Sequence, residues 1–140
     1  MRAVVFAILA SLVWGLAPVF FKLGLRADVS NLFALIVHNF SAFLLALVVY
    51  LLLGEPFRIE PKQIFFLFLG GLLSGFLGLF LYFEAIRHGK VSIAAPIAST
   101  SPLWSVLFAY VILGESLSLQ KFIGVALIIF GITLLTLSRQ

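Results

Sequence analysis

Residues 31–53 read NLFALIVHNFSAFLLALVVYLLL, a stretch without a single charged side chain. A helix that crosses the hydrocarbon core of a bilayer needs about 20 predominantly apolar residues, because each residue advances the helix by about 1.5 Å. This stretch is long enough for one complete crossing. It therefore predicts a transmembrane helix, and it identifies lipid as the solvent in which the rest of the chain folds.

One further apolar run precedes this stretch, and three more follow it. Glycine, proline and charged residues separate them, as in Gly54-Glu55-Pro56 and in the segment from Arg87 to Lys90. Such residues end helices or stay at the membrane interface. No run alternates apolar and polar residues, which is the pattern of a membrane β-barrel strand. We predict an all-α, polytopic membrane protein in which residues 1–140 form one transmembrane domain with five helices, at residues 3–25, 31–53, 64–83, 91–113 and 122–137.

The composition excludes several other classes of protein. Of the 140 residues, 64% are hydrophobic and 10% are charged, whereas soluble domains carry about 25% charged residues. A water-soluble enzyme and a disordered chain are both excluded. The chain has no cysteine, which excludes disulfides and thiolate metal sites. Its net charge of +4 comes from scattered single charges and not from a basic stripe, so we expect the lipid bilayer and no nucleic acid as a partner.

The positive charges are distributed almost evenly between the two sides of the membrane. Five spans place the termini on opposite sides, with Arg2, Arg58, Lys62 and Lys121 on one side and Lys22, Arg26, Arg87, Lys90 and Arg139 on the other. Orientation normally follows an excess of Lys and Arg in cytoplasmic loops. Two explanations stay open. In the first, the charges are too few for their distribution to be informative. In the second, the chain inserts in both orientations (dual topology) and pairs as an antiparallel homodimer. Such a pair would reproduce the inverted repeat of many transporters.

Polar groups inside the first two spans are the first functional candidates, because such groups are costly in lipid. Trp14, Pro18 and Lys22 recur on one face of the first helix. Lys22 either extends to the interface or places a cation at the mouth of a cavity. His38 and Asn39 lie about a third of the way along the second span. They either form a helix–helix hydrogen bond or line a solute pathway.

The third span ends in a candidate for proton coupling. Tyr82 and Glu84 follow the apolar run, and Arg87 is three residues beyond Glu84. Glu84 and Arg87 either form an interfacial pair, or Glu84 is a carboxylate that exchanges a proton during transport. His38 is a second candidate for that proton, because histidine titrates near neutral pH.

Small residues on the third and fifth spans predict close helix packing. Small side chains spaced four residues apart let two helix backbones approach each other in lipid, where the hydrophobic effect provides no attraction. The candidates for such packing are Gly71, Ser74, Gly75, Gly78, Gly124 and Gly131.

The fourth span carries the most informative pattern. Its small residues form one continuous helix face, with the members Ala94, Ala95, Ala98, Ser101, Pro102 and Ser105. Pro96 and Pro102 are expected to break the helix twice, with Ser99 between them. A broken helix within the membrane is tolerated only against protein or water. The face therefore lines a solute pathway, or it packs tightly against another helix.

Catalytic chemistry has no candidate residues in this sequence. There is no carboxylate pair, no nucleophile motif and no phosphate loop, and two histidines on separate segments do not predict a metal site. We expect neither an enzyme nor a resident cofactor.

Several motifs together resemble one family. Trp14-Gly15-x-x-Pro18-Val19-Phe20-x-Lys22 is similar to the opening motif of EamA-type domains in the drug/metabolite transporter superfamily, and the later motifs agree in order and spacing: Tyr82-x-x-Ala85-Ile86-Arg87-x-Gly89-x-Val91-Ser92, Ala95-Pro96-Ile97, Ser101-Pro102-Leu103, Leu113-Gly114-Glu115 and Gly124-Val125. The family often has a basic residue after the glutamate, where this chain has Ser116.

The resemblance implies a five-helix unit. Many members of the family carry two such units in tandem and move metabolites or amino acids across the cytoplasmic membrane, whereas this chain has one. It therefore implies a secondary transporter in the cytoplasmic (inner) membrane of a prokaryote that works as a dimer. The alternative is a membrane subunit that serves only as a scaffold or binds a partner. The four-helix multidrug transporters of similar size depend on a carboxylate in the first span, and this chain has none there.

Overall fold

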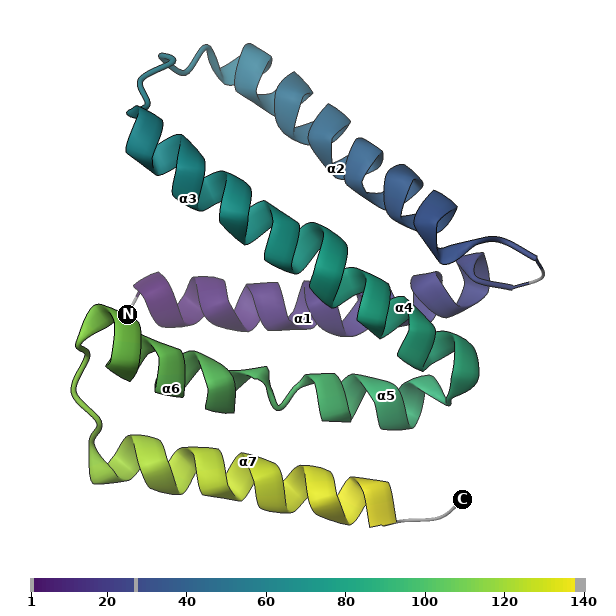
Figure 1. Ribbon diagram of the computed structural model, residues 1–140, viewed down its shortest axis with the longest axis vertical. Coiled ribbons are helices and arrows are strands. Elements are labelled where there is room, and N and C mark those ends of the chain that lie inside the picture. The colour runs from purple at the N-terminus through teal and green to yellow at the C-terminus, as the bar shows by residue number, and fades with distance from the viewer. Residues whose placement is uncertain (1, 27, 138–140) are drawn as a thin grey trace. The chain divides into compact units, whose positions relative to one another are not determined.

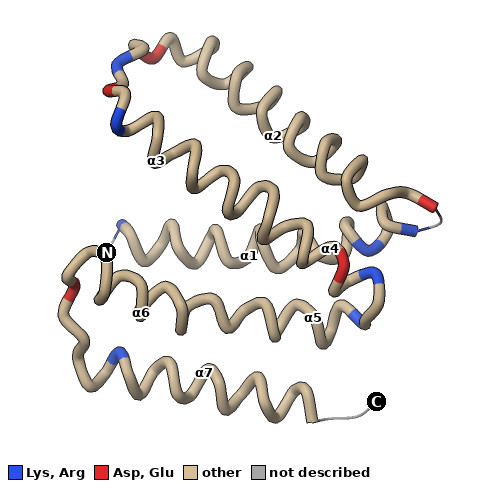
Figure 2. Tube along the Cα trace, in the orientation of Figure 1, with Lys and Arg blue, Asp and Glu red and all other residues tan. Residues whose placement is uncertain are grey.

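The computed structural model describes residues 2–26 and 28–137 (Figure 1). Within them lie five helices that are long and apolar enough to cross a membrane, at Arg2–Gly24, Asn31–Leu53, Pro61–His88, Val91–Leu113 and Leu119–Leu137. The described part contains helices and no strands, which confirms the predicted all-α class with five spans. The charged residues lie near the helix ends and in the connections, as Figure 2 shows. Arg139, counted above among the positive charges, lies outside the described residues.

Finer bounds divide two of the spans. The elements in chain order are α1 (Arg2–Gly24), α2 (Asn31–Leu53), α3 (Pro61–Gly71), η1 (Leu72–Gly78), α4 (Leu79–His88), α5 (Val91–Ala98), α6 (Ser101–Leu113) and α7 (Leu119–Leu137).

The second span has the predicted bounds, but the third and fifth spans are longer than the apolar runs predict. The third begins at Pro61 because Glu60 and Gln63 form a reciprocal capping box, with the backbone N–H of Glu60 donating to Gln63 Oε1 over 3.0 Å. It continues to His88, so that Glu84 lies inside the helix. The fifth begins at Leu119, before the predicted residue 122. Helical hydrogen bonds therefore extend beyond the apolar core into the interface.

Two helices end at the same tripeptide, Leu-Gly-Glu. Gly54 after α2 and Gly114 after α6 adopt left-handed backbone conformations with φ of 63° and 68°. Their N–H groups donate to Tyr50 O and Ala109 O, which satisfies carbonyls that the helix end leaves open. The glycines thus place Glu55 and Glu115 directly beyond the ends of two spans.

The fourth span is interrupted once, and the expectation of two breaks is wrong. Pro96 lies inside α5, and the helix stops at Ser99 and Thr100 before α6 begins. Pro102 occupies the first turn of α6, where a missing N–H costs nothing because that position has no helical acceptor. Only the backbone before Pro102 is therefore forced out of the helix.

The chain divides into two compact units, Val19–His88 and the remainder. In Val19–His88, α2 packs against η1 and α4. The buried side chains of this unit include Leu35, Phe83 and Ile86. In the other unit α5 and α6 contact α7, and Ala94 is buried. No residue of α7 is buried.

The middle of the third span is a π-helix of seven residues, η1, which the sequence did not predict. A side chain at Gly78 would be crowded in this conformation, because a Cβ atom there would lie 3.0 Å from the carbonyl oxygen of Leu73. At Gly70, two residues before η1, the same Cβ would meet open space.

We expect Gly78→Ala to lower the free energy of unfolding by about 1 kcal/mol, because the backbone carbonyl of Leu73 cannot move as a side chain does. Gly70→Ala is the matched control and should be neutral or stabilising by up to about 1 kcal/mol, the ordinary gain of alanine over glycine in a helix. Unfolding by SDS titration in mixed micelles measures both. Equal effects of the two substitutions would contradict the π-helical geometry.

Candidate functional site

A polar network centred on Asn31 joins the start of α2 to the end of α4. Asn31 is 6% exposed. Its Nδ2 donates to Glu84 Oε1 over 2.6 Å, and its Oδ1 accepts from Arg87 Nε over 2.9 Å. Arg87 also donates to the carbonyl of Val29. The Asn31 amide therefore links the Glu84 carboxylate, which its Nδ2 contacts, to the Arg87 guanidinium, which its Oδ1 contacts.

The partners of Glu84 differ from the predicted pair with Arg87. Glu84 Oε2 lies 3.2 Å from His88 Nε2, one helical turn further along α4. Glu84 is linked to Arg87 through the Asn31 amide. Sequence reasoning missed Asn31 as a site residue. The available signal was its position directly after Ser30, whose hydroxyl already accepts from Phe33 N and so leaves the Asn31 amide for another partner.

Lys22 lies against the end of α4. Its Nζ donates to the carbonyl oxygen of Ile86 over 2.6 Å, and Ile86 is fully buried. An ammonium group is favourable there, because the last carbonyls of a helix carry partial negative charge. The structure thus places Lys22 in the same unit as the Asn31 network, on a backbone carbonyl of the helix that contributes Glu84.

His38 lies against two aromatic rings. Its ring centroid is 5.4 Å from that of Phe21 and 6.5 Å from that of Phe83, both edge-on. Phe21 and Phe83 are themselves 5.0 Å apart. Such edge-to-face contacts stabilise packing. His38 therefore connects α1, α2 and α4, and Tyr82 lies half-buried next to Phe83 in sequence.

Asn39 forms the helix–helix hydrogen bond that was one of its two predicted roles. Its Nδ2 donates to Leu35 O in its own helix over 3.0 Å and to Gly75 O in η1 over 2.9 Å. A Cβ atom at Gly75 would lie 3.0 Å from Asn39 Oδ1. A side chain at Gly75 would therefore crowd Asn39 at this close approach. The hydroxyl of Ser74 instead donates to Gly70 O, four residues earlier in the same span, over 2.8 Å.

Three other predicted packing glycines have room for a side chain within the described residues. A Cβ atom at Gly71, Gly124 or Gly131 would have no described atom within 4 Å outside its own helix backbone.

The remaining candidates lie in the unit that contains α5, α6 and α7. At the break of the fourth span, the Ser99 hydroxyl donates to Ala95 O over 2.9 Å and the Thr100 hydroxyl donates to Ile97 O over 2.9 Å. Ser101 and Pro102, which follow, are exposed. In α1, Pro18 is buried and Trp14 is 75% exposed. Pro96 is half-buried inside α5.

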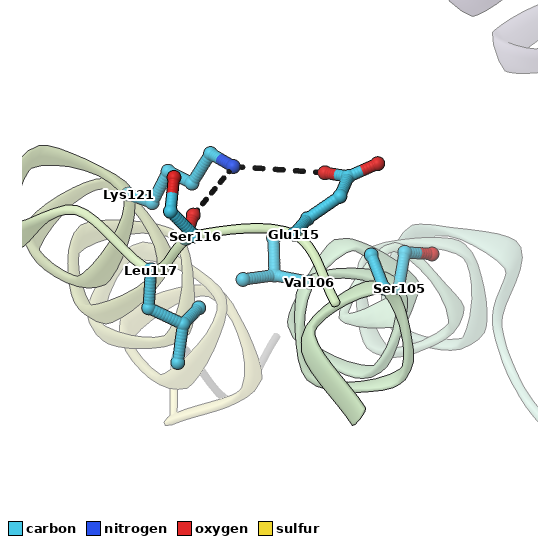
Figure 3. A pocket seen from close by; sticks show the side chains of 7 residues that line it. Ser105, Val106, Glu115, Ser116, Leu117 and Lys121 are labelled. Atoms are coloured by element: carbon cyan, nitrogen blue, oxygen red, sulfur yellow. Dashed lines mark hydrogen bonds and ion pairs between the residues drawn. The ribbon is translucent and has the colours of Figure 1, made fainter. Parts of the chain in front are cut away.

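This unit also contains a pocket of about 280 Å³, at the connection between α6 and α7 (Figure 3). Lys121 Nζ lies 3.7 Å from Glu115 Oε2 and donates to Ser116 O over 3.0 Å. The pocket is lined by Ser105, Val106, Ala109, Glu115, Ser116, Leu117 and Lys121. Ser105 belongs to the small-residue face predicted for the fourth span. Among the residues that the structure describes, no three His, Asp or Glu side chains are grouped so that they could hold a metal ion.

Residues 1–137 match the family model described as the EamA-like transporter family. The chain belongs to the EamA-like transporter family. It is a multi-pass membrane protein with the helices of a single unit of this family, and members of the family are transporters and not enzymes.

Relatives of two lengths match this unit. An uncharacterized protein of Methanocaldococcus jannaschii is 30% identical over 137 residues, which are 98% of each chain. An uncharacterized transporter of Sinorhizobium sp. is 30% identical over 132 residues, 92% of each chain. An uncharacterized transporter of Archaeoglobus fulgidus is 29% identical over 136 residues, 94% of this chain but 47% of the relative. No solved structure matches the chain.

Proposed function

We propose that this EamA protein is a secondary transporter of a small metabolite or amino-acid-like solute, and that it works by alternating access as an antiparallel homodimer in the inner membrane of a prokaryote. The observation that carries the proposal is the break at Ser99 and Thr100. Ser99, Ser101 and Pro102 are exposed in the single chain, yet lipid cannot satisfy an interrupted backbone. We infer that water in a pathway, or protein from elsewhere in the chain or from a second copy, covers this segment.

Two further observations support a pair of units. The chain matches a relative of about twice its length over 47% of that relative, so the same unit occurs within longer transporters. The near-equal positive charge on the two sides of the membrane favours insertion in both orientations. Two opposed copies then form the inverted repeat in which transporters bind solutes near the midplane.

The residues proposed to line the pathway come from four of the spans. They are Trp14, Pro18, Lys22, His38, Asn39, Tyr82, Pro96, Ser99, Ser101 and Pro102. Glu84 and His38 are proposed to couple solute movement to protons. The 3.2 Å contact of Glu84 Oε2 with His88 Nε2 supports this proposal, because it brings two ionisable side chains together.

Transport in proteoliposomes tests the proposal. Purified protein is screened against amino acids and other small metabolites, with and without a pH gradient. Ser99→Ala combined with Ser101→Ala should lower uptake about tenfold, the loss expected for one solute hydrogen bond of about 1.4 kcal/mol. Thr133→Val is the matched control, because its hydroxyl bonds only to Ile129 O in α7. It should leave uptake within about twofold of the unaltered protein.

The scaffold alternative predicts a different outcome. In that case the serine variants change assembly or stability, and no solute is taken up by any variant. The intramolecular contacts of Lys22 and Asn39 agree with such a structural role for these two residues. Measurable uptake by the unaltered protein, lost in assembled serine variants, excludes the alternative.

A further inference from the structure

None of the residues that line the pocket between α6 and α7 is among those proposed above to line the solute pathway. It forms where the chain leaves α6 at Gly114 and enters α7 at Leu119. Its volume of about 280 Å³ is several times the roughly 30 Å³ that one water molecule occupies in the liquid. A connection between two membrane spans lies at the bilayer surface, among lipid head groups. The pocket is therefore large enough, and correctly placed, for part of a lipid.

Opposite charges lie side by side at the pocket. Lys121 Nζ and Glu115 Oε2 are 3.7 Å apart, which is longer than the roughly 2.7–2.9 Å of a tight charged hydrogen bond. Both side chains are about half exposed, at 43% and 55%. Figure 3 shows the ammonium and the carboxylate on the same side of the connection. A ligand with one anionic and one cationic group matches this pair, whereas a ligand with a single charge meets repulsion from one of its members.

The remaining wall of the pocket is mostly apolar. Val106 and Ala109 contribute it from α6, and Leu117 contributes it from the connection. Large apolar side chains in the first turn of α7, Leu119 and Phe122, are exposed. A ligand that is zwitterionic at one end and apolar at the other satisfies both parts.

We propose that this pocket binds a zwitterionic aminophospholipid. Its phosphate accepts from Lys121 Nζ, its primary ammonium donates to Glu115, and an acyl chain lies against Val106 and Leu117. A quaternary choline ammonium has no N–H to donate, so the site prefers an ethanolamine head group over choline. An anionic head group without an ammonium leaves Glu115 repelled. The proposal does not depend on transport.

Native mass spectrometry of the purified full chain tests this preference. The probes are phosphatidylethanolamine, phosphatidylcholine and phosphatidylglycerol with identical acyl chains, present in equal amounts. We expect about tenfold greater retention of the ethanolamine lipid, as one charge-assisted hydrogen bond provides. Equal retention of the three lipids overturns the proposal. So does displacement by millimolar phosphoethanolamine, which identifies a free zwitterion as the ligand.

Variants locate the site. Glu115→Gln should remove the preference for the ethanolamine lipid, and Glu55→Gln should leave it unchanged. Glu55 is the matched control, because it follows the same Leu-Gly pair at the end of α2. The double variant Glu115→Lys with Lys121→Glu keeps an ion pair but reverses its direction, so the preference should stay lost. A preference that survives this exchange overturns the proposed orientation.

Discussion

Asn31→Leu is expected to lower the free energy of unfolding by about 3 kcal/mol, one of the two largest effects among the substitutions considered. The amide of Asn31 donates to Glu84 over 2.6 Å and accepts from Arg87 over 2.9 Å. Leucine leaves a guanidinium and a carboxylate in a part-buried region without the group that joins them, and breaking such a contact costs about 3–5 kcal/mol when it is fully buried. SDS titration in mixed micelles measures the change.

A double-variant cycle separates the network from general packing. If Asn31 acts through Arg87, the combination of Asn31→Leu with Arg87→Met should cost clearly less than the sum of the single changes. Gln63→Leu serves as the control, because it also removes an amide from the same unit but at its exposed end. It should cost about 1 kcal/mol or less. Additive losses for Asn31 and Arg87 would disprove the coupling.

Gly75→Ala is expected to destabilise the same unit by about 2 kcal/mol. The added Cβ would lie 3.0 Å from Asn39 Oδ1, so the amide has to shift by a few tenths of an ångström, which strains its 2.9 Å hydrogen bond to the Gly75 carbonyl. The loss combines one hydrogen bond of about 1 kcal/mol with crowding of a similar size. Gly71→Ala, four residues earlier in open space, should be neutral or slightly stabilising.

The partner variant gives this prediction its sharpest test. Asn39→Ala removes the atom that the new methyl group meets. Adding Gly75→Ala to Asn39→Ala should therefore cost almost nothing further, and unfolding free energies of the three variants measure this directly. A full additional loss of about 2 kcal/mol would show that the crowding at Gly75 comes from another neighbour.

The five spans were predictable because a transmembrane helix is specified locally, by about 20 adjacent apolar residues. The second span agrees at both ends, since Ser30 and Gly54 cap it at the limits of the apolar run. The third span extends beyond its apolar run at both ends. The capping box of Glu60 and Gln63 starts the helix at Pro61. At the other end, Glu84 lies inside the helix and has Asn31 as a partner, so hydrophobicity does not set either limit.

The network around Asn31 and the π-helix could not be predicted from local patterns. Asn31 and Glu84 are separated by 53 positions, so their contact depends on how α2 and α4 pack. The sequence identified Asn39 and Gly75 separately, as a polar residue in lipid and a packing glycine. Their hydrogen bond exists only because the two helices approach each other at that point.

The π-helix changes which way the second half of the third span faces. A π-helix places more residues in each turn than an α-helix does, so every side chain beyond Gly78 is rotated from the direction that a continuous α-helix would give it. Glu84 and Arg87 meet Asn31 in this rotated setting. Conversion of Leu72–Gly78 to α-helix would swing both side chains around the helix axis and away from Asn31, with no helix unfolded. The rotation that the seven π-helical residues introduce thus determines whether the polar network around Asn31 forms.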